Sequence, residues 1–204
     1  MMKKYSIGLL NGIVCSHTNM RKTSIGIKNN KILKIGKINP AECSQIINCE
    51  NKHILPGIID TQVHFREPGL SHKEDIYSGT NSALLGGVTT IFEMPNTSSA
   101  TINKKEIEKK LKIAKKTSWV NYSFFIGACK NNLNKLAKLE KLRGCAGIKI
   151  FMGSSTGSLL LSEEEDIEKA LKICKRRVAI HSEDEERLKK RFANIEKKKG
   201  VSQH

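Results

Sequence analysis

The residues best suited to chemistry lie in one short stretch, residues 60–69 (DTQVHFREPG). Side chains two apart on a strand point to the same side, so a His-x-His pair at a strand end can bind one metal ion with both imidazoles. Here the first of these positions is Gln62 and the second is His64. Because an amide oxygen is a weak, neutral ligand for zinc, the stretch predicts a metal site with one imidazole instead of two.

Two other residues have the chemistry of metal ligands. Lys149 lies inside the apolar run 147–151 (GIKIF), where an unpaired ammonium group would be costly. We expect a lowered pKa or a chemical modification of this lysine, unless its side chain extends outward to water. His181 ends the apolar run 178–181. A single histidine is more often structural than a ligand, but the placement of His64 and His181 at predicted strand ends favours ligands.

Arg66 and Asn96 are suited to bind a small carboxylate. A guanidinium group offers a planar fork to two oxygen atoms, and an amide can donate a further hydrogen bond. The alternative for Arg66 is a surface ion pair with Glu67, its neighbour in the sequence. The loop 153–157 (GSSTG) lacks the lysine of a phosphate-binding P-loop, so we interpret it as part of an active-site loop.

Two regions of different composition must position these residues. Residues 1–53 predict a small β unit, with turns at Asn11-Gly12 and Asn29-Asn30. Its expected strands are residues 6–10, 24–27, 31–35 and 45–48. Over residues 54–204, apolar runs alternate with amphipathic stretches, which predicts repeated strand–helix units. The expected strands are 54–59, 88–93, 119–126, 147–151 and 178–181, and the expected helices are 73–85, 104–116, 133–142, 163–175 and 183–198.

Strands that are each followed by a helix indicate a parallel sheet, either a (β/α) barrel or an open doubly wound sheet. We favour the barrel because His64, Asn96, Lys149 and His181 lie at or near strand ends, where barrel enzymes place their active sites. A complete barrel has eight units, and only five fit in this sequence. The predicted fold is α/β, a partial TIM-like barrel of about five of eight units over residues 54–204, preceded by a partial β-sandwich.

Local signals mark two helix ends. Ser162 and Glu165 have the spacing of a capping box, which predicts that Ser162 caps the fourth helix of the series. Gly86-Gly87 is interpreted as the end of the first helix, because glycine there relieves left-handed backbone strain.

The composition excludes several classes of protein. The 204 residues carry a formal net charge of +16, but the excess lysine is scattered through predicted helices and aromatic residues make up only 5%, so nucleic-acid binding is not expected. Six cysteines form no C-x-x-C pair, which favours reduced, buried thiols. The apolar run near the amino terminus is too short for a signal peptide, and no run has membrane-spanning length. We expect a cytoplasmic protein without a membrane partner.

Several motifs resemble, in order, the amino-terminal half of dihydroorotases, which are cyclic amidohydrolases of the amidohydrolase superfamily. The motifs are residues 56–60 (PGIID), 64–69 (HFREPG), 72–75 (HKED), 86–90 (GGVTT), 94–97 (MPNT), 149–157 (KIFMGSSTG) and 181–184 (HSED). Residues 1–53 resemble the small β-sandwich of that family. The resemblance covers nearly the whole chain. It implies a metal-dependent hydrolase, usually with zinc, that interconverts carbamoyl aspartate and dihydroorotate in pyrimidine biosynthesis.

The resemblance assigns a role to each candidate residue. His64 would be the second histidine of the first-strand pair, Lys149 the lysine that is carboxylated to bridge two metal ions, and His181 a further metal ligand. Arg66 and Asn96 would contact the substrate carboxylate. This favours dihydroorotase over allantoinase and dihydropyrimidinase, whose substrates lack that carboxylate. The expected partners are a small-molecule substrate and either further copies of this chain or a complementing chain.

The chain departs from the family pattern in two places. Gln62 replaces the first histidine ligand, and the sequence ends before the sixth-strand histidine and the eighth-strand aspartate, which serves as the general base. We therefore assign no catalytic base. One interpretation is a dihydroorotase-like hydrolase that is complete only within a longer polypeptide or with a complementing chain. The other is a non-catalytic relative, either a decayed remnant or a structural partner of an active enzyme. In both, we expect this chain alone to bind zinc weakly and to be inactive.

Overall fold

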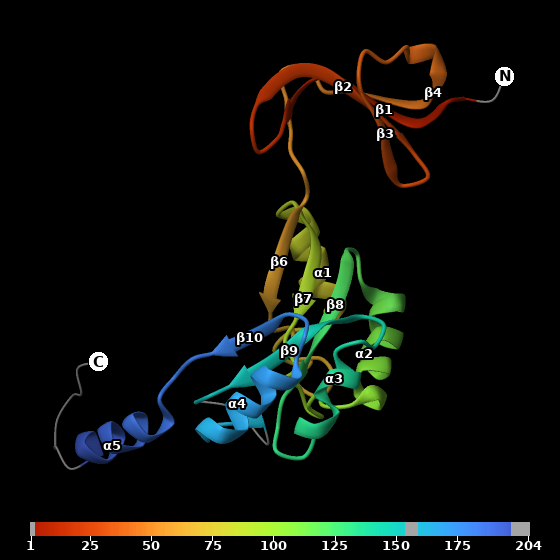
Figure 1. The fold of residues 1–204 in the computed structure, drawn as a ribbon. Helices are drawn as coiled ribbons and strands as arrows, with labels where there is room; N and C mark the ends of the chain where they lie inside the picture. Colours follow the sequence, from red (N-terminus) through yellow and green to blue (C-terminus); the bar gives the residue numbers. More distant parts are fainter. Residues whose placement is uncertain (1–2, 154–158, 197–204) are drawn as a thin grey trace. The chain divides into compact units, whose positions relative to one another are not determined.

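The computed structural model describes residues 3–153 and 159–196, with side chains up to residue 194. The loop 153–157, interpreted above as part of an active-site loop, lies outside the described residues except for Gly153. The chain divides into two compact units, Met1–Gly57 and Ile58–His204. Figure 1 shows that the first unit is built from strands and the second from strands and helices.

The first unit is one mixed sheet of five strands. These are β1 (Tyr5–Cys15), β2 (Met20–Lys28), β3 (Lys31–Gly36), β4 (Cys43–Asn48) and β5 (His53–Ile54), with a 3-10 turn, η1 (Pro40–Glu42), before β4. Their order is β3-β2-β1-β4, and β5 also pairs with β1. Strand β1 is antiparallel to β2 and parallel to β4 and β5. A small core of Tyr5, Leu10, Ile38 and Cys43 stabilises the sheet.

The two turns predicted in this unit have different outcomes. Asn29 and Asn30 connect β2 to β3 in the left-handed conformation, with φ of 52° and 59°, as a tight hairpin turn requires. The predicted turn at Asn11-Gly12 is wrong. Strand β1 continues through it, because a bulge between Leu9 and Gly12 absorbs the positive φ of Asn11 (64°) while pairing with β2 resumes beyond it.

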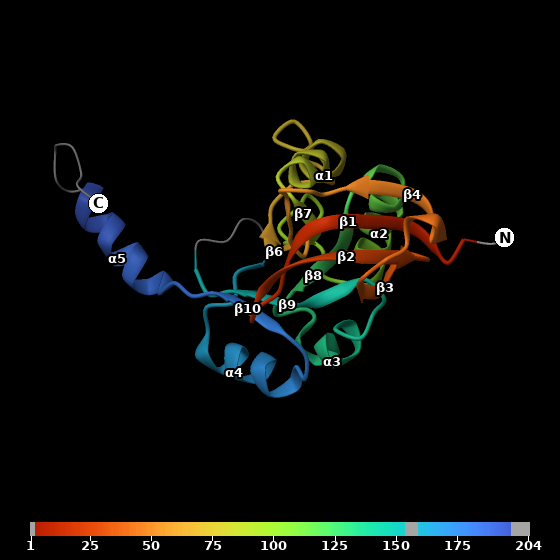
Figure 2. The ribbon, with the colours of Figure 1, turned by 90° about the horizontal axis from the view of Figure 1, so that it is seen from above.

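The second unit is a parallel sheet covered by helices. Its strands are β6 (Ile58–Val63), β7 (Val88–Glu93), β8 (Asn121–Gly127), β9 (Cys145–Phe151) and β10 (Val178–His181), in the order β10-β9-β8-β7-β6. Its helices are α1 (Ile76–Leu85), α2 (Lys104–Thr117), α3 (Leu136–Leu139), α4 (Glu164–Ile173) and α5 (Glu185–Glu196). Figure 2 shows the sheet curved, with α1 to α4 along its outer side. The prediction of five parallel strand–helix units is confirmed, and they form a half-barrel.

Two elements of the second unit differ markedly from their predicted positions. The first strand was expected at 54–59 but β6 begins at Ile58, because Pro56 has no N–H to donate to a neighbouring strand and Gly57 follows it. The helix expected at 133–142 is a 3-10 turn, η2 (Leu133–Lys135), followed by the four-residue α3. Neither piece has a side-chain cap, so the local sequence does not support a longer helix.

Helix caps also test the sequence predictions. Asp75 and Asn103 cap α1 and α2 by accepting the N–H groups of residues 78 and 106. Ser162 was expected to cap α4, and this is wrong: the cap position is Glu163, and the Ser162 hydroxyl donates to the Glu163 carboxylate instead. The interpretation of the glycine pair is confirmed, since Gly86 ends α1 and is followed by a left-handed glycine.

The main core lies between the sheet and its helices. Phe124 and Ile126 of β8 and Ile148 and Ile150 of β9 belong to it and are fully buried. Because side chains alternate along a strand, Lys149 extends to the opposite, inner face of the curved sheet. A second cluster on the sheet contains Met94, Phe125 and Ala146. The alternation therefore separates a helix-facing core from the face that carries the candidate ligand.

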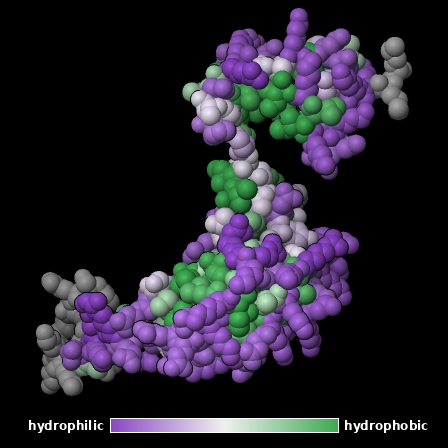
Figure 3. Space-filling model, viewed as in Figure 1, coloured by the Kyte–Doolittle hydropathy of each residue, from purple (hydrophilic) through white to green (hydrophobic). Residues whose placement is uncertain are grey.

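Most of the charge is on the surface. Figure 3 shows hydrophilic residues over most of the visible face, with apolar residues gathered in separate patches. The lysines of α2 are exposed with the single exception of Lys110, which is 1% exposed. All six cysteines are free, and all but Cys15 are buried, as expected for reduced thiols. No helix among the described residues is long and apolar enough to cross a membrane.

Candidate functional site

The candidate residues gather at the carboxyl ends of the parallel strands. His64 follows β6, Asn96 follows β7, Lys149 lies near the end of β9, and His181 is the last residue of β10. In a parallel sheet these ends share one edge, so the predicted residues are brought to one side of the half-barrel.

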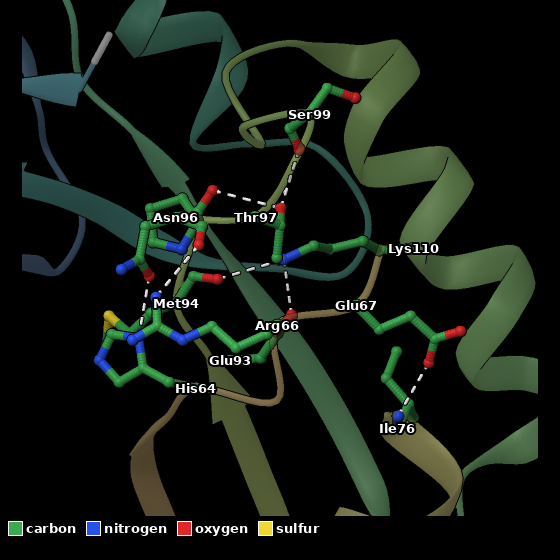
Figure 4. A network of polar contacts seen from close by, with 11 residues as sticks. His64, Arg66, Glu67, Ile76, Glu93, Met94, Asn96, Thr97, Ser99 and Lys110 are labelled. Atoms are coloured by element: carbon green, nitrogen blue, oxygen red, sulfur yellow. Dashed lines mark hydrogen bonds and ion pairs between the residues drawn. The ribbon is translucent and has the colours of Figure 1, made fainter. Parts of the chain in front are cut away.

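His64 and Asn96 contact each other directly (Figure 4). His64 Nδ1 lies 2.9 Å from Asn96 Oδ1. An amide oxygen can only accept, so this contact places the ring hydrogen on Nδ1 and leaves Nε2 as the nitrogen able to bind a metal ion. Burial lowers the pKa of His64, the Asn96 hydrogen bond opposes this, and the positive charges of Arg66, Lys149 and Lys110 lower it further. His64 is therefore held as a neutral, oriented imidazole.

Arg66 also contacts Asn96. Its Nη1 donates to the main-chain carbonyl of Asn96 at 3.4 Å, and its backbone has a positive φ of 69°. Glu67 does not pair with Arg66; its Oε2 accepts the N–H of Ile76, at the start of α1, at 2.8 Å. The alternative of an Arg66–Glu67 ion pair is thus not formed. The guanidinium group and the Asn96 amide lie side by side, as binding of one carboxylate requires.

The loops that carry these residues are packed tightly together. The N–H of Ser98 donates to the carbonyl of Pro68 at 3.1 Å. Gly69 has a φ of +98°, and a Cβ there would collide with the main-chain oxygen of Ser98. Only glycine satisfies both conditions, so the loop after β6 and the loop after β7 depend on it for their close approach.

Lys149 is buried in an apolar setting, as its sequence context indicated. The residue is 2% exposed, and its Nζ lies 4.9 Å from the centroid of the Phe151 ring. Burial lowers its pKa. No described acidic residue forms an ion pair with it, so its ammonium form is stabilised mainly by the aromatic ring.

His181 lies beside the same ring. The centroids of the His181 and Phe151 rings are 6.0 Å apart, and His181 Nε2 lies 2.9 Å from Glu183 Oε2. The carbonyl of His181 accepts the N–H of Met152 at 3.0 Å. Phe151 therefore connects Lys149 and His181, the two candidate ligands from β9 and β10.

These residues fit a metal site only in part. His64 and His181 each have one ring nitrogen near a neighbouring polar group, which is how metal-binding histidines are usually oriented. However, no group of three His, Cys, Asp or Glu residues in the described part of the chain could hold a metal ion. Gln62 is exposed, and its main-chain N–H donates to Asp60 Oδ1 at 3.0 Å. The described residues do not form a metal site by themselves.

A buried ion pair beside the site was not predicted from the sequence. Lys110 Nζ of α2 lies 2.6 Å from Glu93 Oε2 at the end of β7. Burial raises the pKa of Glu93 and lowers that of Lys110, and their mutual attraction opposes both shifts. A signal was present in the sequence, because Ile107, Lys110 and Ala114 have the spacing of one helix face.

Comparisons with known proteins agree with this arrangement. Residues 51–154 match the family model described as dihydro-orotase-like. The dihydroorotase of Methanosarcina acetivorans is 39% identical over 183 residues, which is 88% of this chain and 39% of that protein. An allantoinase of Desulfitobacterium hafniense is 37% identical over 151 residues, covering 74% of this chain and 33% of that protein. The chain thus spans about two fifths of the length of the curated dihydroorotase.

The fold is shared with a solved hydantoinase. L-hydantoinase (dihydropyrimidinase) from Arthrobacter aurescens superposes with a TM-score of 0.87 at 22% identity, over 96% of this chain and 45% of that one. This likeness concerns the fold, a (β/α) barrel of which the present chain forms five strands. Because the family model covers just over half of the 204 residues, the chain belongs to the dihydroorotase-like family of amidohydrolases.

Proposed function

We propose that this chain provides the substrate-carboxylate site and part of the metal-binding edge of a dihydroorotase-like enzyme, which interconverts carbamoyl aspartate and dihydroorotate in pyrimidine biosynthesis. The observation that carries the proposal is the adjacency of Arg66 and Asn96 at the strand ends. A guanidinium fork and an amide suit a carboxylate on the ring. Relatives described as dihydroorotases at 36–39% identity support this choice of substrate.

Members of this family generally use a metal ion. We propose zinc, with His64, a carboxylated Lys149 and His181 as the ligands that this chain contributes. A bound zinc would polarise the cyclic amide. Carboxylation would replace a buried cation by an anionic oxygen ligand, which suits the uncompensated position of Lys149. Within this set, Asn96 orients the imidazole of His64.

The same site explains why the chain alone is proposed to be inactive. Hydrolysis needs a base that takes a proton from water. Three carboxylates that lie near His64, Asn96 and His181 in the sequence are engaged: Glu67 accepts from Ile76, Glu93 pairs with Lys110, and Glu183 contacts His181. We therefore propose that self-association or a complementing chain supplies the base. We also propose a cytoplasmic location.

Dihydroorotate and dihydrouracil differ only by the ring carboxylate, so a comparison of the two tests the proposal. We expect dihydroorotate, but not dihydrouracil, to shift the NMR resonances of the Arg66 guanidinium and the Asn96 amide. Arg66→Met should remove the response, whereas Arg143→Met, at an exposed arginine, should retain it. An equal response to both compounds would favour allantoinase-like or dihydropyrimidinase-like chemistry. No response to either would favour a non-catalytic role.

A further inference from the structure

The buried ion pair between Glu93 and Lys110 adjoins the candidate site (Figure 4). Glu93 is the last residue of β7 and Lys110 is in the middle of α2, and each side chain is 1% exposed. Removing two charges from water is costly, and well-packed apolar residues of similar size often stabilise a protein as well or better. Stabilisation of the fold is therefore a weak explanation for this pair.

Lys110 Nζ makes two further contacts. It donates to the main-chain carbonyl of Met94 at 3.1 Å and lies 5.4 Å from the centroid of the Phe124 ring. The N–H of the same residue is held by β6, because it donates to the carbonyl of Val63 at 3.0 Å. Met94 is thus fixed between α2 and the strand that leads to His64.

The residues after Met94 carry the side chain that orients His64. Pro95 restricts the backbone between Met94 and Asn96, and its carbonyl accepts the N–H of Thr97 at 2.9 Å. This short, rigid segment leaves little freedom between the Met94 carbonyl and the Asn96 amide. A displacement of Met94 would therefore displace the Asn96 oxygen from the ring of His64.

We propose that Lys110 is a positioning residue for the site: with Glu93 as its counter-ion, it holds the Met94 carbonyl so that Asn96 meets the His64 ring in one orientation. Lys110 acts through Met94 and Asn96 and touches no substrate. The proposal deepens the proposed function and rests on it for the purpose of the oriented groups. The orientation itself is measurable without substrate, metal ion or turnover.

The test is the tautomer of neutral His64 in the full 204-residue chain. Two-bond ¹H–¹⁵N NMR of histidine-labelled protein distinguishes Nδ1–H from Nε2–H, and loss of one signal set in His64→Gln assigns this residue among six histidines. The test variant is Glu93→Leu/Lys110→Met, which buries no charge and keeps similar volumes. Lys109→Met, at the exposed neighbouring position of α2, is the matched control.

We expect the wild type and Lys109→Met to show the Nδ1–H form of His64. The double variant should unfold cooperatively, with a midpoint close to that of the wild type, and yet lose this form. Retention of the Nδ1–H form in a folded double variant would overturn the proposal. If the apolar double variant does not fold, Glu93→Gln/Lys110→Met is measured instead, with the same expected and contradicting results for the Nδ1–H form of His64. Failure of both to fold would also overturn it, because the pair would then serve the fold.

This readout separates the two proposals. If dihydroorotate fails to bind while the tautomer changes as expected, the proposed substrate is wrong and the positioning role of Lys110 stands. If dihydroorotate binds through Arg66 while the tautomer is unchanged in the double variant, the positioning role is wrong and the proposed function stands.

Discussion

His64 Nδ1 lies 2.9 Å from Asn96 Oδ1, so the ends of two neighbouring strands are joined through side chains of the candidate site. Asn96→Leu keeps a similar volume and removes the acceptor. We expect the pKa of His64 to fall further below 6.5, because burial remains and the hydrogen bond that opposes it is lost. NMR titration of the His64 ring measures this shift. An unchanged or higher pKa would show that the contact does not act on the ring, and Asn121→Leu, at an exposed position, is the control.

The lowered pKa of His64 also predicts a pH dependence of stability. Between the folded-state pKa and 6.5, the unfolded chain binds more protons at this residue than the folded chain. The free energy of unfolding should therefore rise with pH across that window and fall as the pH drops through it. Urea unfolding at a series of pH values should show a shallower slope for His64→Gln than for the wild type. The control His17→Gln, at an exposed histidine, should keep the wild-type slope. If it lowered the slope as much as His64→Gln does, the predicted role of His64 would be wrong.

Glu140 is predicted to fix the approach to β10. Its carboxylate is fully buried and accepts the main-chain N–H groups of Lys175, at 3.1 Å to each oxygen, and Arg176, at 3.0 Å. Glu140→Ala leaves these donors unsatisfied and should cost about 2–3 kcal/mol of unfolding free energy. Glu168→Ala, which removes only an exposed pair with Lys172, should cost less than about 0.5 kcal/mol. Equal losses of unfolding free energy for the two variants, measured by urea unfolding, would contradict the predicted role of Glu140.

Substitutions at Gly69 and Gly87 distinguish the cost of a steric collision from the cost of backbone strain. Both have a positive φ, but a Cβ at Gly69 would collide with Ser98, whereas a Cβ at Gly87 would meet no atom within 4 Å. Gly87→Ala should cost about 1–2 kcal/mol through strain alone. Gly69→Ala should cost more and should also broaden or shift the His64 resonances, because the two site loops are forced apart. A smaller loss at Gly69 than at Gly87 in urea unfolding would refute this account of the loops.

The fold was largely predictable because its signals are local. The strands 88–93 and 178–181 were predicted with their observed bounds, since apolar runs bounded by turns define buried strands. The strand expected at 54–59 and the cap expected at Ser162 were misplaced, because proline placement and competition between neighbouring side chains decided those ends.

The site was predictable in part for a similar reason. Strand ends brought His64, Arg66 and Asn96 together as expected, and the burial of Lys149 followed from its apolar neighbours. The pairing of Glu93 with Lys110 was not foreseen, because it joins a strand end to the middle of a helix 17 residues later. Such contacts depend on how the helix packs on the sheet.

We propose that this chain carries a dihydroorotase-like site that is not sufficient for catalysis. Gln62→His should raise the zinc content of the purified chain, because imidazole binds zinc better than an amide oxygen, without producing turnover.

The most direct measurement is dihydroorotate hydrolysis by the purified wild-type chain, with zinc content determined on the same sample. We expect weakly bound zinc and no hydrolysis above background. Robust hydrolysis that a metal chelator abolishes would contradict this expectation.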